Sequence, residues 1–107
     1  MTSWYVYIIE ATDSRLYTGI TTDVERRWDE HAGNTPSKKK GAKFFRGRKP
    51  KYLRFVQQIE SRSLASQLEA KIKKISRAAK IELIESPENQ FTEYKSLPIQ
   101  SKTGIQC

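Results

Sequence analysis

The longest unbroken apolar stretch of the chain is the run Trp-Tyr-Val-Tyr-Ile-Ile at residues 4–9. Aromatic and β-branched residues without polar interruption predict a strand at residues 4–10 that is buried on both faces. The run is far too short to span a membrane. No basic stretch precedes it and no small-residue cleavage site follows it, so we expect no signal peptide. Cys107, the lone cysteine, fits a reducing cytosol, and we expect a cytoplasmic protein with no membrane partner.

The remaining patterns predict a small α+β domain. Residues 12–15 are typical of a turn, residues 16–21 of the returning strand of a hairpin, and residues 51–59 of a third strand. Helices are expected at residues 22–31, 61–75 and 76–84, and the residues expected to begin them are Thr22, Ser61 or Ser63, and Ser76. The expected fold is a three-stranded antiparallel sheet flanked by about three helices, in the order β-β-α-β-α-α.

The chain of 107 residues is expected to hold one domain, at residues 1–85. Residues 86–107 are polar, contain Pro87 and Pro98 and show no sustained period, which predicts a disordered tail. The second helix should bury one apolar stripe, which is formed by Leu64, Leu68, Ile72 and Ile75.

Positive charge is concentrated in the middle of the chain. Residues 36–80 hold fifteen lysines and arginines against two acidic residues, whereas the segments on either side are mildly acidic. Such clustering indicates a phosphate-rich partner, with a basic surface kept for solubility as the alternative. Residues 37–50 predict a long exposed loop, and Phe44 and Phe45 either stack on bases or anchor that loop to the core. The cations expected to bind nucleic acid are Lys38, Lys39, Lys40, Lys43, Arg46, Arg48, Lys49 and Lys73.

The first predicted helix places polar side chains on its packing face. Val24 and Trp28 are its large apolar residues, and Arg27 and His31 share their stripe at i, i+3, i+4 and i+7 spacing. A guanidinium near a core needs a partner, which makes Arg27 a candidate catalytic group. The alternatives are an arginine whose stem packs while its head reaches solvent, and a histidine that serves the helix dipole.

A single carboxylate stands out in the second predicted helix. Between residues 61 and 81 there are six basic residues and one acid, Glu69, which borders the apolar stripe. Glu69 is either an ion-pair partner of Lys73, four residues on, or a metal ligand. One carboxylate can hold Mg²⁺ when waters and substrate oxygens complete its coordination.

Two tyrosines and a glycine complete the set of candidate residues. Tyr7 and Tyr17 lie on predicted strands, where a core aromatic with a hydrogen-bonded hydroxyl is the ordinary interpretation. Gly19 follows Tyr17 by two residues and therefore lies on the same face. A glycine within a strand often marks the close approach of another group, so we expect that face to be open beside the phenol.

From residue 4 to about residue 84 the chain resembles the GIY-YIG nuclease superfamily, and it looks most like the small, standalone single-domain bacterial members. The segment Tyr5-Val6-Tyr7 stands in place of the first motif, and Tyr17-Thr18-Gly19 in place of the second. Arg27 and His31 match the helix of the family, and Glu69 matches its metal-binding glutamate. Tyr5 and Thr18 depart from the usual glycine and isoleucine. We identify no equivalent of the family's asparagine, because Asn89 falls in the predicted tail.

The resemblance implies phosphodiester hydrolysis with one Mg²⁺ or Mn²⁺ per site. Glu69 would hold the ion, Arg27 would bind the non-bridging oxygens, and Tyr17 or Tyr7 would act as general base. His31 could help to move the proton. A free phenol is only about 0.1% ionised at pH 7, and Arg27, the metal and the basic surroundings are expected to favour its ionised form.

We therefore expect a monomeric, metal-dependent endonuclease or nickase that acts on DNA, with structural selectivity suited to repair or recombination. RNA is the alternative substrate. The competing hypotheses are a catalytically weak or inactive nucleic-acid-binding module, and an accessory subunit whose protein partner supplies targeting. Nothing in the sequence suggests a device for reading base sequence, which favours these alternatives, whereas the presence of Glu69 favours an enzyme.

Overall fold

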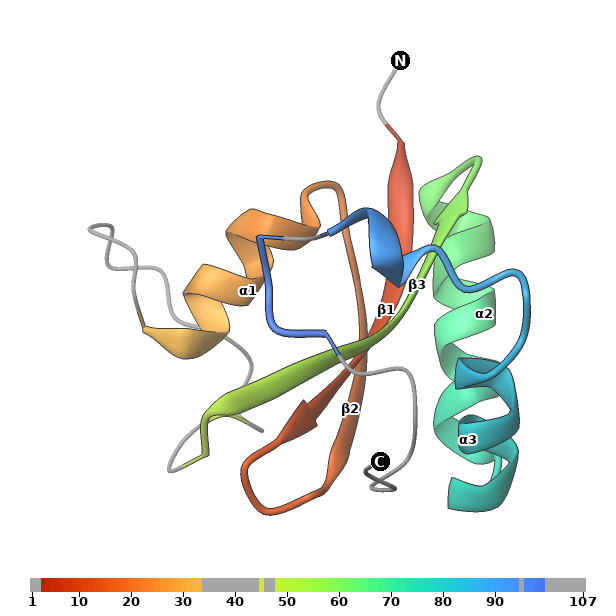
Figure 1. Ribbon diagram of the computed structural model, residues 1–107. Helices are drawn as coiled ribbons and strands as arrows, with labels where there is room; N and C mark the ends of the chain where they lie inside the picture. The colour runs from red at the N-terminus through yellow and green to blue at the C-terminus, as the bar shows by residue number, and fades with distance from the viewer. Residues whose placement is uncertain (1–2, 34–44, 46–47, 95, 100–107) are drawn as a thin grey trace.

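The computed structural model describes residues 3–33, 45, 48–94 and 96–99, and it has the predicted α+β order (Figure 1). The three strands form one antiparallel sheet in the order β2-β1-β3, so β1 is the central strand. The elements are β1 (Trp4–Ala11), β2 (Leu16–Thr21), α1 (Val24–Ala32), β3 (Pro50–Ile59), α2 (Arg62–Lys74), α3 (Arg77–Ile84) and the short 3₁₀ helix η2 (Phe91–Glu93). No helix of the described residues is long and apolar enough to cross a membrane.

The sheet is buried on both faces, as the apolar run predicts. On one face Tyr7 and Ile9 of β1 pack with Trp28 of α1. On the other face Val6 and Ile8 pack with residues of α2 and α3. Figure 1 shows α1 on one side of the sheet and α2 with α3 on the other. Burying each large apolar side chain contributes about 1.5–3 kcal/mol, which explains why one continuous apolar strand organises the fold.

The helix starts agree with the predicted caps in two of three cases. Ser61 accepts a hydrogen bond from the Leu64 N–H, and Ser76 accepts one from the Ala79 N–H. Asp23 caps α1 in place of Thr22, and its carboxylate accepts from the Arg26 N–H at 3.0 Å. The reason is local, because the Thr21 hydroxyl bonds the backbone of Asp23 and fixes it as the last extended residue.

The apolar stripe of α2 is only partly buried. Ala65 and Ile72 are fully covered, but Leu64 is 46% exposed and Ile75 is 36% exposed. The helix is therefore rotated so that the line through Ala65, Leu68 and Ile72 faces the sheet, and Leu64 falls outside that line.

The expected disordered tail is wrong for residues 86–94 and 96–99, which pack along β3. The Leu53 N–H donates to the carbonyl oxygen of Pro98 at 2.7 Å, and the Gln90 N–H donates to that of Val56 at 2.7 Å. Phe91 is buried on the α1 side of the sheet. These contacts lie at irregular intervals along the chain, so no periodicity reveals them. Residues 95 and 100–107 lie outside the described residues.

Candidate active site

Three elements bring Tyr7, Tyr17 and His31 together on the α1 side of the sheet. Tyr7 Oη and His31 Nε2 form a buried hydrogen bond of 2.8 Å. The ring centroids of Tyr17 and His31 are 5.4 Å apart, and those of Tyr7 and Tyr17 are 6.1 Å apart. Phe45 lies on the same cluster, with its ring centroid 4.3 Å from that of His31. Phe45 is therefore part of the core, whereas Phe44 lies outside the described residues.

Gly19 provides the space that this cluster occupies. It is the partner of Tyr7 across the β1–β2 pair. A Cβ atom at position 19 would lie 2.5 Å from Tyr7 Oη and 2.7 Å from Tyr7 Cζ. Any other residue at this position would therefore displace the phenol from His31. The glycine allows the close approach that the sequence predicts, but the group that approaches is Tyr7.

Arg27 is held beside the cluster by a partner that the sequence reasoning missed. Its Nη1 donates to Glu30 Oε1 at 2.8 Å, and the Glu30 side chain is only 9% exposed. Burial by itself lowers the pKa of Arg27, but hydrogen bonds with Glu30 and Tyr7 outweigh it and raise the pKa. The guanidinium is thus charged at any physiological pH. The i, i+3 spacing of Arg27 and Glu30 is the signal that could have found this pair.

The protonation state of Tyr7 differs from the one that the sequence predicts. Burial raises its pKa, the neighbouring Tyr17 raises it further, and Arg27 opposes the shift without reversing it. Burial also lowers the pKa of His31 to about 3, with Arg27 as the second cause. Tyr7 is therefore a neutral phenol and His31 a neutral imidazole at pH 7. The expectation that the cationic surroundings ionise the phenol does not hold at Tyr7, because burial is the larger effect.

Glu69 lies on α2, on the other side of the sheet from α1. Its side chain is 22% exposed and lies on the sheet-facing side of the helix, between buried Ala65 and Ile72. Lys73 Nζ is 3.3 Å from its carboxylate, so the ion pair considered from the sequence is present. The negative charge of Glu69 also contributes to the raised pKa of Tyr7. This effect is weaker than those of burial, Tyr17 and Arg27.

The donor chemistry at Glu69 is compatible with a magnesium ion. The described residues contain no group of three or more His, Cys, Asp or Glu that could hold a metal. Mg²⁺ commonly needs only one or two carboxylates, with waters and phosphate oxygens as its other ligands. A partly exposed carboxylate whose ion-pair partner is an exposed lysine can accept such an ion, so Glu69 fits the expected role.

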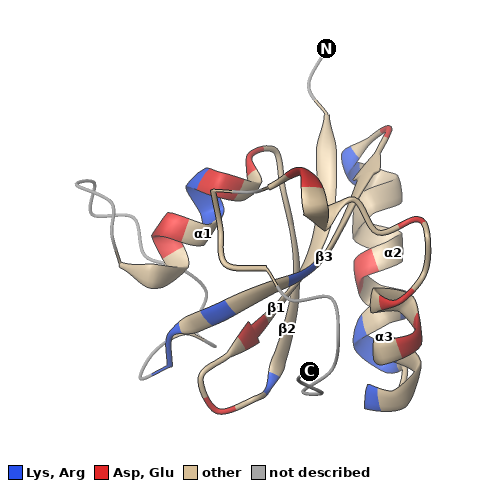
Figure 2. Ribbon diagram, in the orientation of Figure 1, with Lys and Arg blue, Asp and Glu red and all other residues tan. Residues whose placement is uncertain are grey.

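The predicted nucleic-acid-binding cations are only partly within the described residues. Arg48 pairs with Asp13 at 2.7 Å, Lys49 is exposed and Lys73 pairs with Glu69. Most of the described lysines and arginines lie on α1, on β3 and along α2 and α3 (Figure 2), and the others are Arg15 before β2 and Arg48 and Lys49 before β3. The predicted cations outside the described residues are Lys38, Lys39, Lys40, Lys43 and Arg46.

The mixed sheet-and-helix fold and the Tyr7, Tyr17, Arg27 and His31 cluster define a domain class. Residues 3–82 match the model of the GIY-YIG catalytic domain, and the chain belongs to the GIY-YIG family.

Known relatives agree with this assignment. The chain is 44% identical over 84 residues to a UPF0213 protein of Citrobacter koseri, which covers 78% of this chain and 79% of the relative. It is 43% identical over 84 residues to the UPF0213 protein YhbQ of Escherichia coli O8, with the same coverage of 78% and 79%. The solution NMR structure of the UPF0213 protein BH0048 from Bacillus halodurans matches 92% of this chain and 99% of its own, with 28% identity and a TM-score of 0.49. The family match and the two sequence relatives confirm the resemblance to small bacterial members of the family.

Proposed function

We propose that the protein is a metal-dependent phosphodiester hydrolase that cleaves or nicks DNA. The observation that carries the proposal is the arrangement of Arg27, Tyr17 and the Tyr7–His31 pair in one cluster. Membership of a family of catalytic domains supports an enzyme, and the concentration of positive charge supports a nucleic acid as substrate.

Each residue has a distinct task in the proposed reaction. Arg27 binds the non-bridging oxygens of the scissile phosphate, and its bond to Glu30 fixes the guanidinium for that task. Tyr17, which is less buried than Tyr7, acts as the general base that takes a proton from the attacking water. Tyr7 stays protonated and holds His31 in place through the Oη–Nε2 bond.

Glu69 is the residue that would hold Mg²⁺ or Mn²⁺. When bound, the ion would polarise the phosphate and stabilise the negative charge that develops on the leaving oxygen. Release of Glu69 from Lys73 is part of this proposal, because the carboxylate would exchange one cation for another.

The test is nicking of supercoiled, branched and single-stranded DNA with Mg²⁺ or Mn²⁺, together with a single-stranded RNA. Arg27→Ala and Glu69→Gln should each reduce cleavage by at least 100-fold, on the order of 3 kcal/mol of lost transition-state stabilisation. Glu60→Gln is the matched control, because Glu60 is exposed and lies next to the start of α2. Equal residual cleavage in all four proteins would remove the hydrolase proposal.

A nucleic-acid-binding module with little turnover is the second candidate. The Glu69–Lys73 ion pair favours it, since a carboxylate that stays paired cannot hold a metal. In that case the protein binds DNA without cleaving it, and Glu69→Gln leaves the affinity unchanged in the presence and absence of Mg²⁺.

A further inference from the structure

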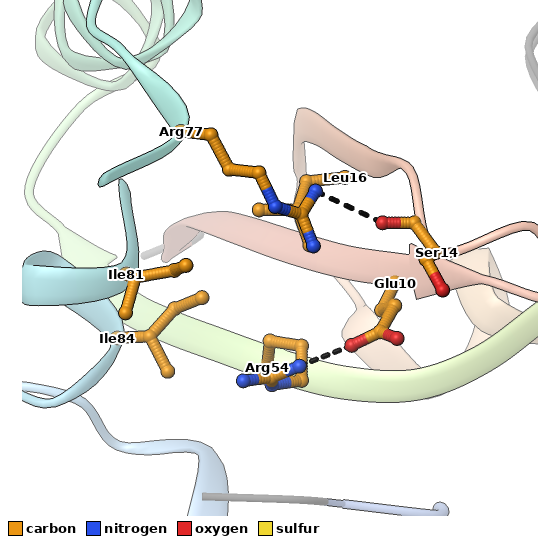
Figure 3. Close-up of a pocket in the computed structure, with 7 residues that line it drawn as sticks. All are labelled: Glu10, Ser14, Leu16, Arg54, Arg77, Ile81 and Ile84. Carbon is orange, nitrogen blue, oxygen red and sulfur yellow. Dashed lines mark hydrogen bonds and ion pairs between the residues drawn. The ribbon is translucent and has the colours of Figure 1, made fainter. Parts of the chain in front are cut away.

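A polar cavity lies on the α3 side of the sheet, on the face opposite the Tyr7–His31 cluster (Figure 3). It has a volume of about 240 Å³. The residues that line it are Glu10, Ser14, Leu16, Arg54, Arg77, Ile81 and Ile84. Glu10 is three residues after Tyr7 on β1, so the two side chains leave the strand on opposite faces. The proposed hydrolysis uses none of these residues.

A bulge in β3 is the reason that an arginine enters this cavity. Phe55 pairs with Ile8 and Leu53 pairs with Ile9, so Arg54 is an extra residue without a partner on β1. Bulges of this kind redirect a side chain and free backbone groups. Here the side-chain amide of Asn89 donates to the carbonyl oxygen of Arg54 at 2.7 Å and accepts from the Val56 N–H at 3.0 Å. The Asn89 side chain therefore bonds the β3 backbone both at the bulge residue Arg54 and two residues after it.

Arg54 is buried with unused hydrogen-bond donors. The residue is 2% exposed, and its Nη1 makes an ion pair with Glu10. Its Nε and Nη2 atoms are buried and have no hydrogen-bond partner. These two nitrogens form one edge of the planar guanidinium, the edge that binds carboxylate or phosphate oxygens in pairs. Buried donors are almost always satisfied in folded proteins, so this edge lacks an acceptor that a ligand in the cavity would supply.

A second arginine reaches the same cavity from the start of α3. Arg77 Nη1 donates to the carbonyl oxygen of Ser14 at 2.9 Å, which fixes the side chain against the β1–β2 turn. Figure 3 shows Arg77 and Arg54 on different sides of the space, with Ile81 and Ile84 forming an apolar wall. Two arginines and one glutamate give the lining a formal charge of +1. The apolar wall strengthens the attraction between this charge and an anion.

We propose that this cavity binds a phosphate group. The volume is below the range of roughly 300–1,000 Å³ that suits drug-sized ligands, so the ligand is small or enters by its end. A tetrahedral phosphate has enough oxygens to accept hydrogen bonds from the Arg54 edge and from Arg77 together. In a carboxylate, one arginine that binds through two nitrogens already uses both oxygens. The group is either free inorganic phosphate or the terminal phosphate of a nucleic acid strand.

The test follows the amide signals of Ser14 and Leu16 by NMR while inorganic phosphate is added to the full chain. Saturable shifts at these two residues are expected. Arg77→Gln should weaken binding by about tenfold, since a hydrogen bond to a charged group is lost. Lys80→Gln is the matched control, because it removes the same charge from α3 at a position that does not line the cavity. Arg27→Gln should leave these shifts unchanged, which separates the cavity from the proposed active site.

Two further experiments test the proposed phosphate site. Ile81→Trp fills the cavity without changing its charge and should abolish the shifts while the protein stays folded. A short oligonucleotide with a 5′-phosphate, compared with its 5′-hydroxyl form, distinguishes a strand end from free phosphate as the source. No shift with phosphate or with the 5′-phosphate strand would overturn the proposal. Equal affinity in wild type, Arg77→Gln and Ile81→Trp would overturn it as well.

Discussion

Gly19 shows how a single residue controls the geometry of the candidate site. In Gly19→Ala the new methyl group would meet Tyr7 Oη and Cζ at less than contact distance, so the phenol has to move away from His31. We expect a loss of about 1–3 kcal/mol in the free energy of unfolding, as for other overpacked sites. Urea denaturation measures this loss. In a Tyr7→Val background the penalty should largely vanish, and an unchanged penalty there would contradict the explanation.

His31 makes the stability of the protein depend on pH. Its pKa in the folded state is about 3, below the value of 6.5 in an unfolded chain, so the unfolded state binds the proton more tightly. The stabilisation is complete above pH 6.5 and is lost as the pH falls towards 3. Between pH 7 and pH 5 the loss should be about 2 kcal/mol.

Urea denaturation at pH 7 and pH 5 tests this dependence. In His31→Gln the difference between the two pH values should shrink to the contribution of the carboxylates. A wild-type protein that is equally stable at both pH values would show that His31 is protonated without cost in the folded state.

At the scale of the elements, Asn89 joins the end of α3 to the bulge of β3. Its side-chain amide donates to the carbonyl oxygens of Arg54 and Ile84, and its oxygen accepts from the Val56 N–H. Asn89→Ala would leave these backbone groups unpaired, and we expect it to lower the free energy of unfolding by about 2–4 kcal/mol. Gln58→Ala is the control, because the exposed Gln58 side chain donates to the Ser3 hydroxyl at the surface, and its loss should cost under about 0.5 kcal/mol. Equal losses in the two variants would contradict the role of Asn89.

The strands and helices could be predicted from sequence because their signals are local. The apolar run of β1 and the serine caps of α2 and α3 need no knowledge of distant contacts. The bulge at Arg54 and the cavity beside it could not be predicted, because the register of β3 depends on pairing with β1 across more than forty residues. The hydrogen bonds between the Asn89 side chain and the backbone of β3 depend on that same bulge.

The proximity of Arg27 and His31 could be predicted from the sequence, but the pKa shifts in the candidate site could not. Helical spacing indicates that Arg27 and His31 share a face, and the structure has both beside Tyr7. The raised pKa of Tyr7 and the lowered pKa of His31 follow from burial, which arises only when the sheet and α1 close over them.

At the scale of the whole molecule, the distribution of charge predicts how DNA binding depends on salt. If Lys38, Lys39 and Lys40 contact phosphates, replacing all three by Gln should reduce the slope of log K against log salt by about 2.7. Fluorescence anisotropy over a salt series measures the slope. The matched control replaces Lys71, Lys74 and Lys80 of α2 and α3, which carry the same charge at a different place. Equal changes in the two triple variants would mean that only net charge matters.

The segment after α3 occupies the side of β3 that faces away from β1. Leu53 and Val56 bond residues of this segment, so the backbone groups there are not free to bond another chain. A strand with an unpaired row of backbone groups is a template for intermolecular sheet growth. A chain cut after Ser86 would offer such a template and should form concentration-dependent dimers or larger assemblies in sedimentation experiments. The segment that the sequence predicts to be a disordered tail would thus prevent the sheets of two molecules from joining through β3.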